Sequence, residues 1–430
     1  MEGLPPRPDL GRFMMSAGFI LRPTRFLDAC HETCGDYFTL LPAKDRVIVT
    51  TADPAAVKQV FSASDDELRA GEANIILAPI LGMRSVLLLD GPEHMRQRKL
   101  MLPPFHGERM RAYEEIMREV AQREVATWPR GPRFGALQSM QAITLEVIMR
   151  AVFGVDDAGE RERLGAALRG QLDVLANPRR VMMLALTQGR MGARSPWVRF
   201  EAAQREADTL IYDQIRARRA DPGTDREDIF SLLLAARDED GEPLSDQELR
   251  DELMTLLVAG HETTATALAW TLERVTRHPE VLARLQAHPG DAEYIDAVMT
   301  ESLRLRPVVP AVLRKLQKPM EFGGWQLPAG VNIALSIYLL HRRADLYPDP
   351  LAFMPERFLG KKPGTYEWIP FGGGIRRCLG ASFALFEMKT VLQTVLREAE
   401  LRPARRRAER VNRRAVTFTP ARGGRIALTG

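Results

Sequence analysis

The chain has 430 residues, of which 45% are hydrophobic and 27% are charged, and its formal net charge at pH 7 is +4. This composition is typical of a globular protein with a large buried core, and so small a net charge argues against a nucleic-acid partner. Three cysteines are too few for a disulfide scaffold and are expected in a reducing compartment.

No apolar stretch approaches the roughly 18 residues that a membrane-spanning helix needs. The segment Met14–Leu21 is apolar but too short, and Arg12 and Arg22 stand at its two ends. The pattern of a signal peptide, a basic start followed by an apolar core and a small-residue cleavage site, is absent. The sequence therefore predicts a cytoplasmic protein without a membrane span.

The first part of the chain predicts a small region of strands with flanking helices. Hydrophobic periodicity and turn residues indicate a helix, two paired strands and a second helix over Pro23–Gly35, Tyr37–Leu41, Arg46–Thr50 and residues 54–61. Residues 73–89 are apolar but irregular, because a proline and a glycine interrupt their periodicity.

Residues 90–219 are predicted to be mainly helical. A helix follows Asp90, and its His94 and Arg98 share a face because they are four residues apart. Further on, amphipathic helices follow one another with few chemical motifs. Four apolar residues in this part are plausible pocket residues, although core packing is the default for such side chains: Met182, Met183, Leu184 and Leu186.

A long helix is predicted from the capping box of Ser245 and Glu248 as far as His278. At its centre, Gly260, Thr263, Thr264 and Ala267 recur at helical spacing and form a face of small residues. Glycine and threonine are poor choices in the middle of a helix, so another requirement must override propensity. A bulky flat cofactor against this face would supply one.

The C-terminal half combines one further helix with short strands. The helix is expected over Asp291–Arg306, ending before a proline, and Glu301 and Arg304 share one of its faces. A later segment carries Arg357 within Pro355–Phe358. Extended structure is predicted over Val308–Val312, Phe322–Trp325, Val331–Leu339 and Val416–Ile426.

Residues 371–380 read Phe-Gly-Gly-Gly-Ile-Arg-Arg-Cys-Leu-Gly and lead into a predicted helix. Consecutive glycines let a flat ligand approach the backbone, and a helix start beside Arg376 and Arg377 favours a thiolate at Cys378. Such a sulfur could be a nucleophile, a zinc ligand or a haem ligand. Zinc needs about four ligands and no second cysteine or histidine lies nearby, whereas thiolate ligation of haem needs one cysteine.

This loop resembles the haem-binding loop of the cytochrome P450 family, Phe-x-x-Gly-x-Arg-x-Cys-x-Gly, with every fixed position filled. Residues 259–263 resemble its Ala/Gly-Gly-x-Asp/Glu-Thr element, and Glu301-x-x-Arg304 and Pro355–Phe358 resemble two further landmarks. The resemblance implies a mainly α fold with small β-sheets (α+β), in which a long central helix lies over a haem and a cysteine loop lies beneath it. It also implies a proline-containing lead segment over 1–22 and a single catalytic domain over 23–430.

The resemblance assigns roles to matching positions. Cys378 would bind the iron, while Glu262 and Thr263 would deliver protons during oxygen activation. Glu301, Arg304 and Arg357 would be structural and would lock the cysteine loop. The cofactor would be contacted by His94, Arg98, Ala259, Gly260, Arg314, Phe371, Gly372, Arg376, Cys378 and Gly380, and the substrate pocket would include Ala259, Val308, Val309 and Val312.

The function implied is that of a haem-thiolate monooxygenase that inserts one atom of dioxygen into an apolar substrate by hydroxylation or epoxidation. The substrate would be a terpenoid, fatty acid, steroid or polyketide. The haem would be of b type, because no Cys-x-x-Cys-His is present. Electrons would come from a ferredoxin or flavodoxin with its NAD(P)H-dependent reductase, docking on a monomer through Lys99, Arg109, Arg111 and Arg377. The alternatives are a peroxide-driven peroxygenase and a non-catalytic haem sensor.

Overall fold

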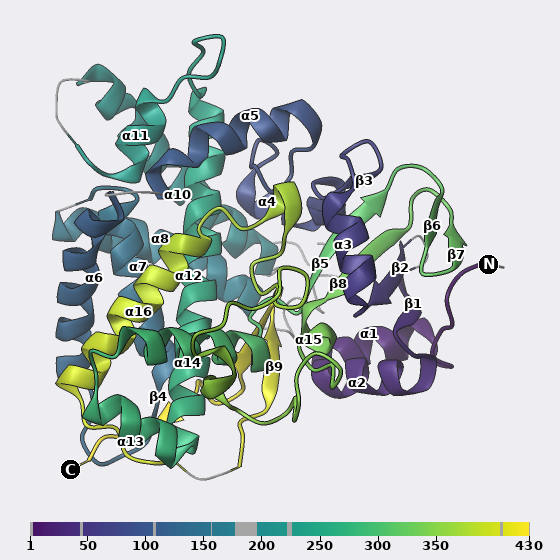
Figure 1. Ribbon diagram of the computed structural model, residues 1–430. Helices are drawn as coiled ribbons and strands as arrows, with labels where there is room; N and C mark the ends of the chain where they lie inside the picture. The colour runs from purple at the N-terminus through teal and green to yellow at the C-terminus, as the bar shows by residue number, and fades with distance from the viewer. Residues whose placement is uncertain are drawn as a thin grey trace.

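The structure is a computed structural model that describes residues 3–43, 46–105, 109–155, 157–176, 196–221, 226–404 and 407–429. Helices dominate it, and the strands β1–β3 and β5–β8 gather on one side (Figure 1). The α-helices are α1 Arg12–Leu21, α2 Pro23–Cys34, α3 Pro54–Ser62, α4 Ala78–Leu81, α5 Gly91–Met101, α6 Arg109–Ala126, α7 Ala136–Ala151, α8 Ala158–Ala176, α10 Pro196–Ala220, α11 Ile229–Ala235, α12 Asp246–Arg277, α13 Pro279–Ala287, α14 Ala292–Leu305, α15 Ile337–Leu340 and α16 Ala381–Glu398.

Short 3₁₀ turns and strands connect these helices. The turns are η1 Glu72–Leu77, η2 Pro103–Phe105, η4 Pro355–Phe358 and η5 Gly374–Arg376. The strands are β1 Tyr37–Ala43, β2 Arg46–Thr51, β3 Leu68–Arg69, β4 Phe134–Gly135, β5 Ala311–Leu316, β6 Met320–Phe322, β7 Trp325–Leu327, β8 Asn332–Ser336, β9 Val411–Arg414, β10 Thr417–Pro420 and β11 Arg425–Ile426.

Helix α12 runs through the middle of the helical part and packs against α7, α10, α14 and α16 (Figure 1). It begins at the predicted capping box, in which the Ser245 side chain accepts from the Glu248 N–H and the Glu248 carboxylate accepts from the Ser245 N–H. Its 32 residues span roughly 48 Å at 1.5 Å per residue. The residue after it, His278, precedes a proline, which disfavours further helix.

The largest sheet has the strand order β1-β2-β8-β5-β3. Strands β1 and β2 are antiparallel, as predicted, and β8 pairs parallel with β2 and antiparallel with β5. One hydrophobic cluster lies beneath this sheet and α1–α3, and a second fills the space among the long helices. Residues 308–316 join the two clusters, since Val308 belongs to the cluster among the helices and Leu316 of β5 to the cluster beneath the sheet.

The predicted limits of several strands were wrong. The segment Phe322–Trp325 is the turn of a hairpin, because Gly323 and Gly324 have φ of +58° and +88° and residues 322 and 325 pair across them. Strand β8 ends at Ser336, whose hydroxyl accepts from the Leu339 N–H and starts α15 in place of a longer strand.

The other strand limits also moved. Strand β5 begins at Ala311, three residues after the predicted start at Val308, because the carbonyl of Val308 accepts from the Phe418 N–H in another part of the fold. The predicted segment Val416–Ile426 is two strands, β10 and β11, which pair with β9 and β4 in separate sheets.

Helix α1 lies inside the predicted lead segment and packs against α2 and β1. The division at residue 23 stays a prediction. In the part of the chain that the structure describes, no helix is both long and apolar enough to cross a bilayer. Met182, Met183, Leu184 and Leu186 and the side chain of Arg109 lie outside the described residues.

Candidate active site

The cysteine loop folds as a short turn that presents one sulfur. The Cys378 N–H donates to the Phe371 carbonyl at 2.9 Å, the Gly380 N–H bonds to the sulfur, and α16 begins at Ala381. The cysteine is exposed, yet protein surrounds it closely enough that burial raises the pKa of its thiol. A side chain that is accessible and still desolvated lines a hollow inside the protein.

Burial and nearby charges act in opposite directions on the charge state of Cys378. Arg98, Arg377 and the Gly380 N–H lower the pKa of the thiol, but burial outweighs them, and Arg376 instead pairs with Asp90. Burial therefore works against the predicted thiolate, and the two arginines and the Gly380 N–H work in its favour. A metal ion bound to this sulfur would favour the thiolate, because a coordinating thiol is deprotonated.

Two of the three consecutive glycines serve packing rather than ligand approach. A Cβ on Gly373 would lie 2.3 Å from the Phe61 ring, and one on Gly374, at φ +63°, would lie 2.3 Å from the Phe61 carbonyl oxygen. Both glycines therefore let the loop pass close to α3. Gly372, at φ +65°, has more room, since a Cβ there would lie 3.7 Å from Val312, and no atom would lie within 4 Å of a Cβ on Gly380.

Four nitrogen-bearing side chains converge near this loop from three elements: His94 and Arg98 from α5, Arg314 from β5 and Arg376 from η5. Burial and the neighbouring arginines lower the pKa of His94 to about 3, so this imidazole is neutral. Burial and Arg376 lower the pKa of Arg314 to about 10. The resemblance predicted that these residues lie together, and the structure does bring them within electrostatic range.

This cation cluster fits an anionic ligand. The guanidinium of Arg98 makes no hydrogen bond or ion pair with the residues that the structure describes, and the Nδ1 atom of His94 is buried with no partner there. Asp90 pairs with Arg376, from which it accepts at 2.5 Å, and Asp65 and Asp90 also lie within electrostatic range of Arg314. Buried charges without partners are costly, so binding of the two carboxylates that a haem carries would stabilise the cluster.

The central part of α12 borders accessible space on one side. Ala259 is exposed, and Gly260 and Thr263 are half-buried, although the helix on either side is almost wholly buried. Residues 259 and 263 are four apart and share a face. An exposed alanine in the middle of a central helix shows that this face borders a hollow.

Part of the face of small residues on α12 packs against other parts of the protein. A Cβ on Gly260 would lie 3.1 Å from Ile148 of α7, so this glycine permits close packing of two helices. Thr264 and Ala267 are buried. The prediction that a flat cofactor accounts for the whole small face was therefore wrong for Thr264 and Ala267; Ala259, Gly260 and Thr263 keep accessible surface.

The predicted acid and alcohol lie next to each other on α12 and make different contacts. The Thr263 hydroxyl donates to the carbonyl of Ala259 within the helix. The Glu262 carboxylate accepts from Gln141 of α7 at 2.7 Å and pairs with Arg414 of β9 at 3.4 Å. The side chain of His261 on α12 reaches α7, where its Nδ1 bonds to the Thr144 hydroxyl at 2.9 Å. Glu262 is therefore held by two elements outside its own helix.

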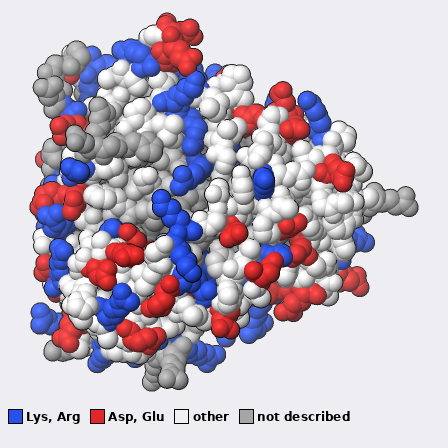
Figure 2. Space-filling model, in the orientation of Figure 1, with Lys and Arg blue, Asp and Glu red and all other residues white. Residues whose placement is uncertain are grey.

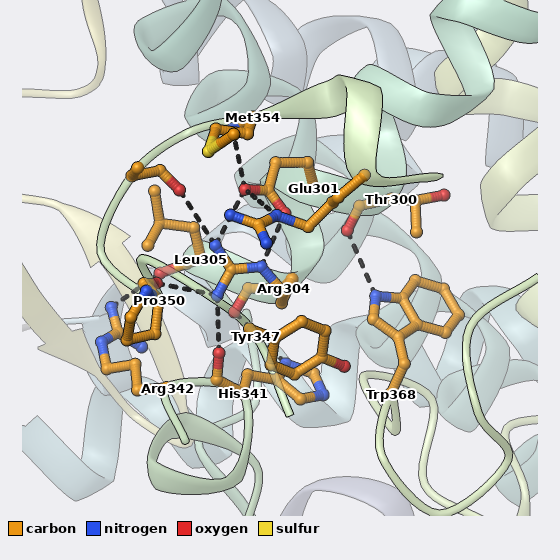
Figure 3. A network of polar contacts seen from close by, with 12 residues as sticks. Thr300, Glu301, Arg304, Leu305, His341, Arg342, Tyr347, Pro350, Met354 and Trp368 are labelled. Atoms are coloured by element: carbon orange, nitrogen blue, oxygen red, sulfur yellow. Dashed lines mark hydrogen bonds and ion pairs between the residues drawn. The ribbon is translucent and has the colours of Figure 1, made fainter. Parts of the chain in front are cut away.

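The predicted triad of Glu301, Arg304 and Arg357 forms a buried network (Figure 3). Arg304 donates from Nε and Nη2 to the two oxygens of Glu301, at 2.6 and 2.8 Å. Its other hydrogens reach three backbone carbonyls, those of His341, Pro350 and Ala352. All five donors of this guanidinium are thus used. Glu301 also accepts from the Met354 N–H and from Arg357.

Comparisons with known proteins identify the family. The cytochrome P450 family model matches residues 5–423. Relatives from Mycobacterium tuberculosis include cytochrome P450 135B1, 44% identical over 99% of this chain and 91% of its own length, and cytochrome P450 138, 40% identical over 99% and 96%. A solved structure, the retinoic acid bound cyanobacterial CYP120A1, aligns with a TM-score of 0.82 at 24% identity, covering 99% of each chain.

The chain belongs to the cytochrome P450 family. The predicted fold class, a helix-rich P450 fold with small sheets, is confirmed. Membership makes the protein a monooxygenase, an oxidoreductase that uses a haem iron cofactor. The described residues fit that cofactor, since an accessible sulfur lies within electrostatic range of Arg98, whose guanidinium has no ion pair among them.

Sequence reasoning missed His341, a neutral histidine buried in this P450 between the triad and the cysteine loop. Its Nδ1–H donates to the Arg304 carbonyl at 3.2 Å, and its Nε2 accepts from the Ile369 N–H at 2.9 Å. Burial and the Arg304 charge lower the pKa of His341 to about 3. Trp368, next to Ile369, donates to the Thr300 carbonyl (Figure 3). These bonds tie α14 to the chain just before Phe371, and no local sequence signal reveals them.

The predicted pocket residues of the P450 do not share one environment. Val309 and Val312 are half-buried, and Val312 lies beside Gly372 of the cysteine loop. Val308 is buried in the helical core, where its side chain packs with other apolar groups. Val308 is therefore a core residue in this structure, while Ala259, Val309 and Val312 have accessible surface.

Proposed function

We propose that Cys378 supplies the thiolate that binds the iron of a non-covalent haem b, and that His94, Arg98, Arg314 and Arg376 bind its two carboxylates. The observation that carries this proposal is the position of Arg98. Its guanidinium lies within electrostatic range of the Cys378 sulfur and also of His94 and Arg376. A ligand with both an iron and two acidic arms could therefore contact the sulfur and this cluster together.

The haem, when bound, supplies the activation of dioxygen and the transfer of one oxygen atom. The protein supplies protons from α12. Because the Thr263 O–H is used by the Ala259 carbonyl, the hydroxyl can only accept a hydrogen bond from the hollow. It can therefore hold a water in a fixed orientation. The Glu262 carboxylate, which Gln141 and Arg414 position, would pass protons from bulk solvent to that water.

The substrate is proposed to be apolar and to be hydroxylated or epoxidised. Ala259, Val309 and Val312 are the predicted pocket residues with accessible surface, and each of them has a purely hydrocarbon side chain. Such walls exclude water and orient a substrate by shape rather than by hydrogen bonds. A terpenoid, a fatty acid, a steroid and a polyketide all satisfy this requirement.

Electrons are proposed to come from an acidic ferredoxin or flavodoxin and its NAD(P)H-dependent reductase. Figure 2 shows a band of basic side chains down the middle of the face on which α16 lies. Arg111 and Arg377 are exposed, whereas Lys99 is paired with Glu239 at 2.6 Å. Long-range attraction between this face and an acidic carrier would speed their encounter and would weaken as salt is added.

Replacing Thr263 by alanine tests the proton route. The variant should bind haem normally, because among the described residues the hydroxyl bonds to its own helix alone. We expect NADH consumption with ferredoxin and reductase to continue while product per NADH falls by about a factor of ten and peroxide accumulates. The measurement is the ratio of product to NADH, with Thr271→Ala as a control, since the Thr271 hydroxyl bonds to the Ala267 carbonyl in the same way but is fully buried.

Unchanged coupling in Thr263→Ala would remove this hydroxyl from the proton route. Product formation with hydrogen peroxide that exceeds the NADH-driven rate in the unmodified protein would favour the peroxygenase. No turnover under either condition, with haem bound and a spin-state response to apolar compounds, would favour the sensor.

A further inference from the structure

Helix α1 presents its apolar side chains to solvent. Phe13, Met14 and Leu21 are 74%, 58% and 63% exposed, although large apolar side chains are normally turned inward on a surface helix. At 100° per residue, these three side chains and that of the half-buried Ala17 fall within one arc of the helix. The outward side of α1 is therefore a continuous apolar face.

The opposite side of α1 already anchors it to the protein. Met15 is buried, and Gly18 lies so close to Phe26 of α2 that a Cβ would be 2.7 Å from its ring. The Ser16 hydroxyl donates to the Pro42 carbonyl of β1 at 3.1 Å. Because these contacts use the inner side, α1 cannot turn its apolar face inward without breaking them.

Positive charge surrounds this apolar face. Arg12 is the first residue of α1, Arg22 follows its last residue and Arg25 lies on α2; all three are exposed. They make no ion pair with the residues that the structure describes. Over residues 7–25 the sequence holds four arginines and a single carboxylate, that of Asp9. An apolar stripe with unpaired arginines at its edges is the pattern of a helix that lies on an anionic lipid surface.

We propose that α1 is a docking site for anionic membrane surfaces, on which the protein rests without crossing the bilayer. The helix has ten residues and is roughly 15 Å long, too short to span the hydrocarbon core. Lying flat, it places Phe13, Met14 and Leu21 in the boundary between headgroups and acyl chains, and the arginines reach lipid phosphates. This proposal is independent of the substrate proposed above.

A second copy of the chain fits the same face less well. In a symmetric dimer each copy uses the same surface patch. The interface would therefore hold Arg12, Arg22 and Arg25 of one copy close to the same three arginines of the other. Like charges held together in this way oppose association. A lipid surface with negative headgroups instead satisfies the apolar face and the arginines together.

The test is co-sedimentation of the full-length haem-loaded protein with large vesicles. Vesicles of phosphatidylcholine mixed with phosphatidylglycerol should bind the protein at low salt. Vesicles of phosphatidylcholine alone should bind it with an affinity at least roughly tenfold lower. The variants Phe13→Ser/Leu21→Ser and Arg12→Gln/Arg22→Gln/Arg25→Gln should each lose about tenfold in binding to the mixed vesicles. Leu351→Ser, at a residue 72% exposed in the loop after β8 and α15, is the matched control and should bind normally.

Each variant must retain the absorption spectrum of the unmodified protein, which verifies folding independently of lipid binding. Binding of both variants equal to that of the unmodified protein, or no binding of the unmodified protein to the mixed vesicles, would overturn the proposal. Equal binding to both vesicle types would also overturn it, since the arginines would then have no role. Dimerisation in sedimentation velocity that Phe13→Ser/Leu21→Ser abolishes, without vesicle binding, would assign the face to a second copy.

Discussion

Replacing Cys378 by serine should yield a protein whose reduced carbon monoxide complex lacks the red-shifted Soret band, and whose monooxygenase turnover falls below detection. A serine hydroxyl is a poor iron ligand at neutral pH, and it does not donate electron density to the iron as a thiolate does. The loop itself should survive, because the backbone makes the bond from the Cys378 N–H to the Phe371 carbonyl, and a serine hydroxyl can still accept from the Gly380 N–H.

Cys34→Ser is the matched control for this experiment. Cys34 is a half-buried free cysteine at the end of α2, among side chains of the strand-rich side. We expect the Cys34 variant to keep the red-shifted band and its turnover. A normal band in the Cys378 variant would place the iron ligand elsewhere in the chain, and loss of the band in both variants would point to unfolding rather than ligation.

Replacing Arg304 by leucine should destabilise the protein by about 3–5 kcal/mol, because the change leaves the buried Glu301 charge without its closest partner. Arg304 and Glu301 have no exposed side-chain surface, so water cannot compensate. Three backbone carbonyls, those of His341, Pro350 and Ala352, lose their donor as well. Lysine should not restore stability, because an ammonium cannot bond bidentately to a carboxylate and reach these carbonyls.

The measurement is the free energy of unfolding in urea, followed by the extent of haem uptake at equal protein concentration. Arg118→Gln is the control, since Arg118 pairs with Glu114 and Glu115 on the exposed side of α6 and should contribute less than about 1 kcal/mol. A loss in Arg304→Leu no larger than that in Arg118→Gln would show that the network does not hold the fold. Normal stability with impaired haem uptake would restrict its role to the cysteine loop.

The sequence predicted what depends on local patterns. The capping box of Ser245 and Glu248 fixes the start of α12, and helical spacing places Ala259 and Thr263 on one face. The cation cluster around Arg98 and the triad around Arg304 could be named only through the resemblance to P450s, because each of them joins segments that lie far apart in the chain. Spacing along the sequence does not by itself bring such segments together.

What the sequence could not predict depends on contacts between distant segments. Gly373 and Gly374 are explained by Phe61, and Gly260 by Ile148; each of these partners belongs to another element. His341 has no flanking pattern that distinguishes it, although both its ring nitrogens are bonded in the core. The balance between burial and nearby cations at Cys378 likewise depends on the packed surroundings of the sulfur.

The central claim, that the sulfur of Cys378 binds the haem iron, is tested most directly by anomalous diffraction at the iron edge from crystals of the haem-loaded protein. We expect one iron peak at bonding distance from the Cys378 sulfur, on the side that faces Ala259 and Thr263, with the haem carboxylates against Arg98, Arg314 and Arg376. An iron peak remote from Cys378, or bonded to another residue such as His94, would contradict the account.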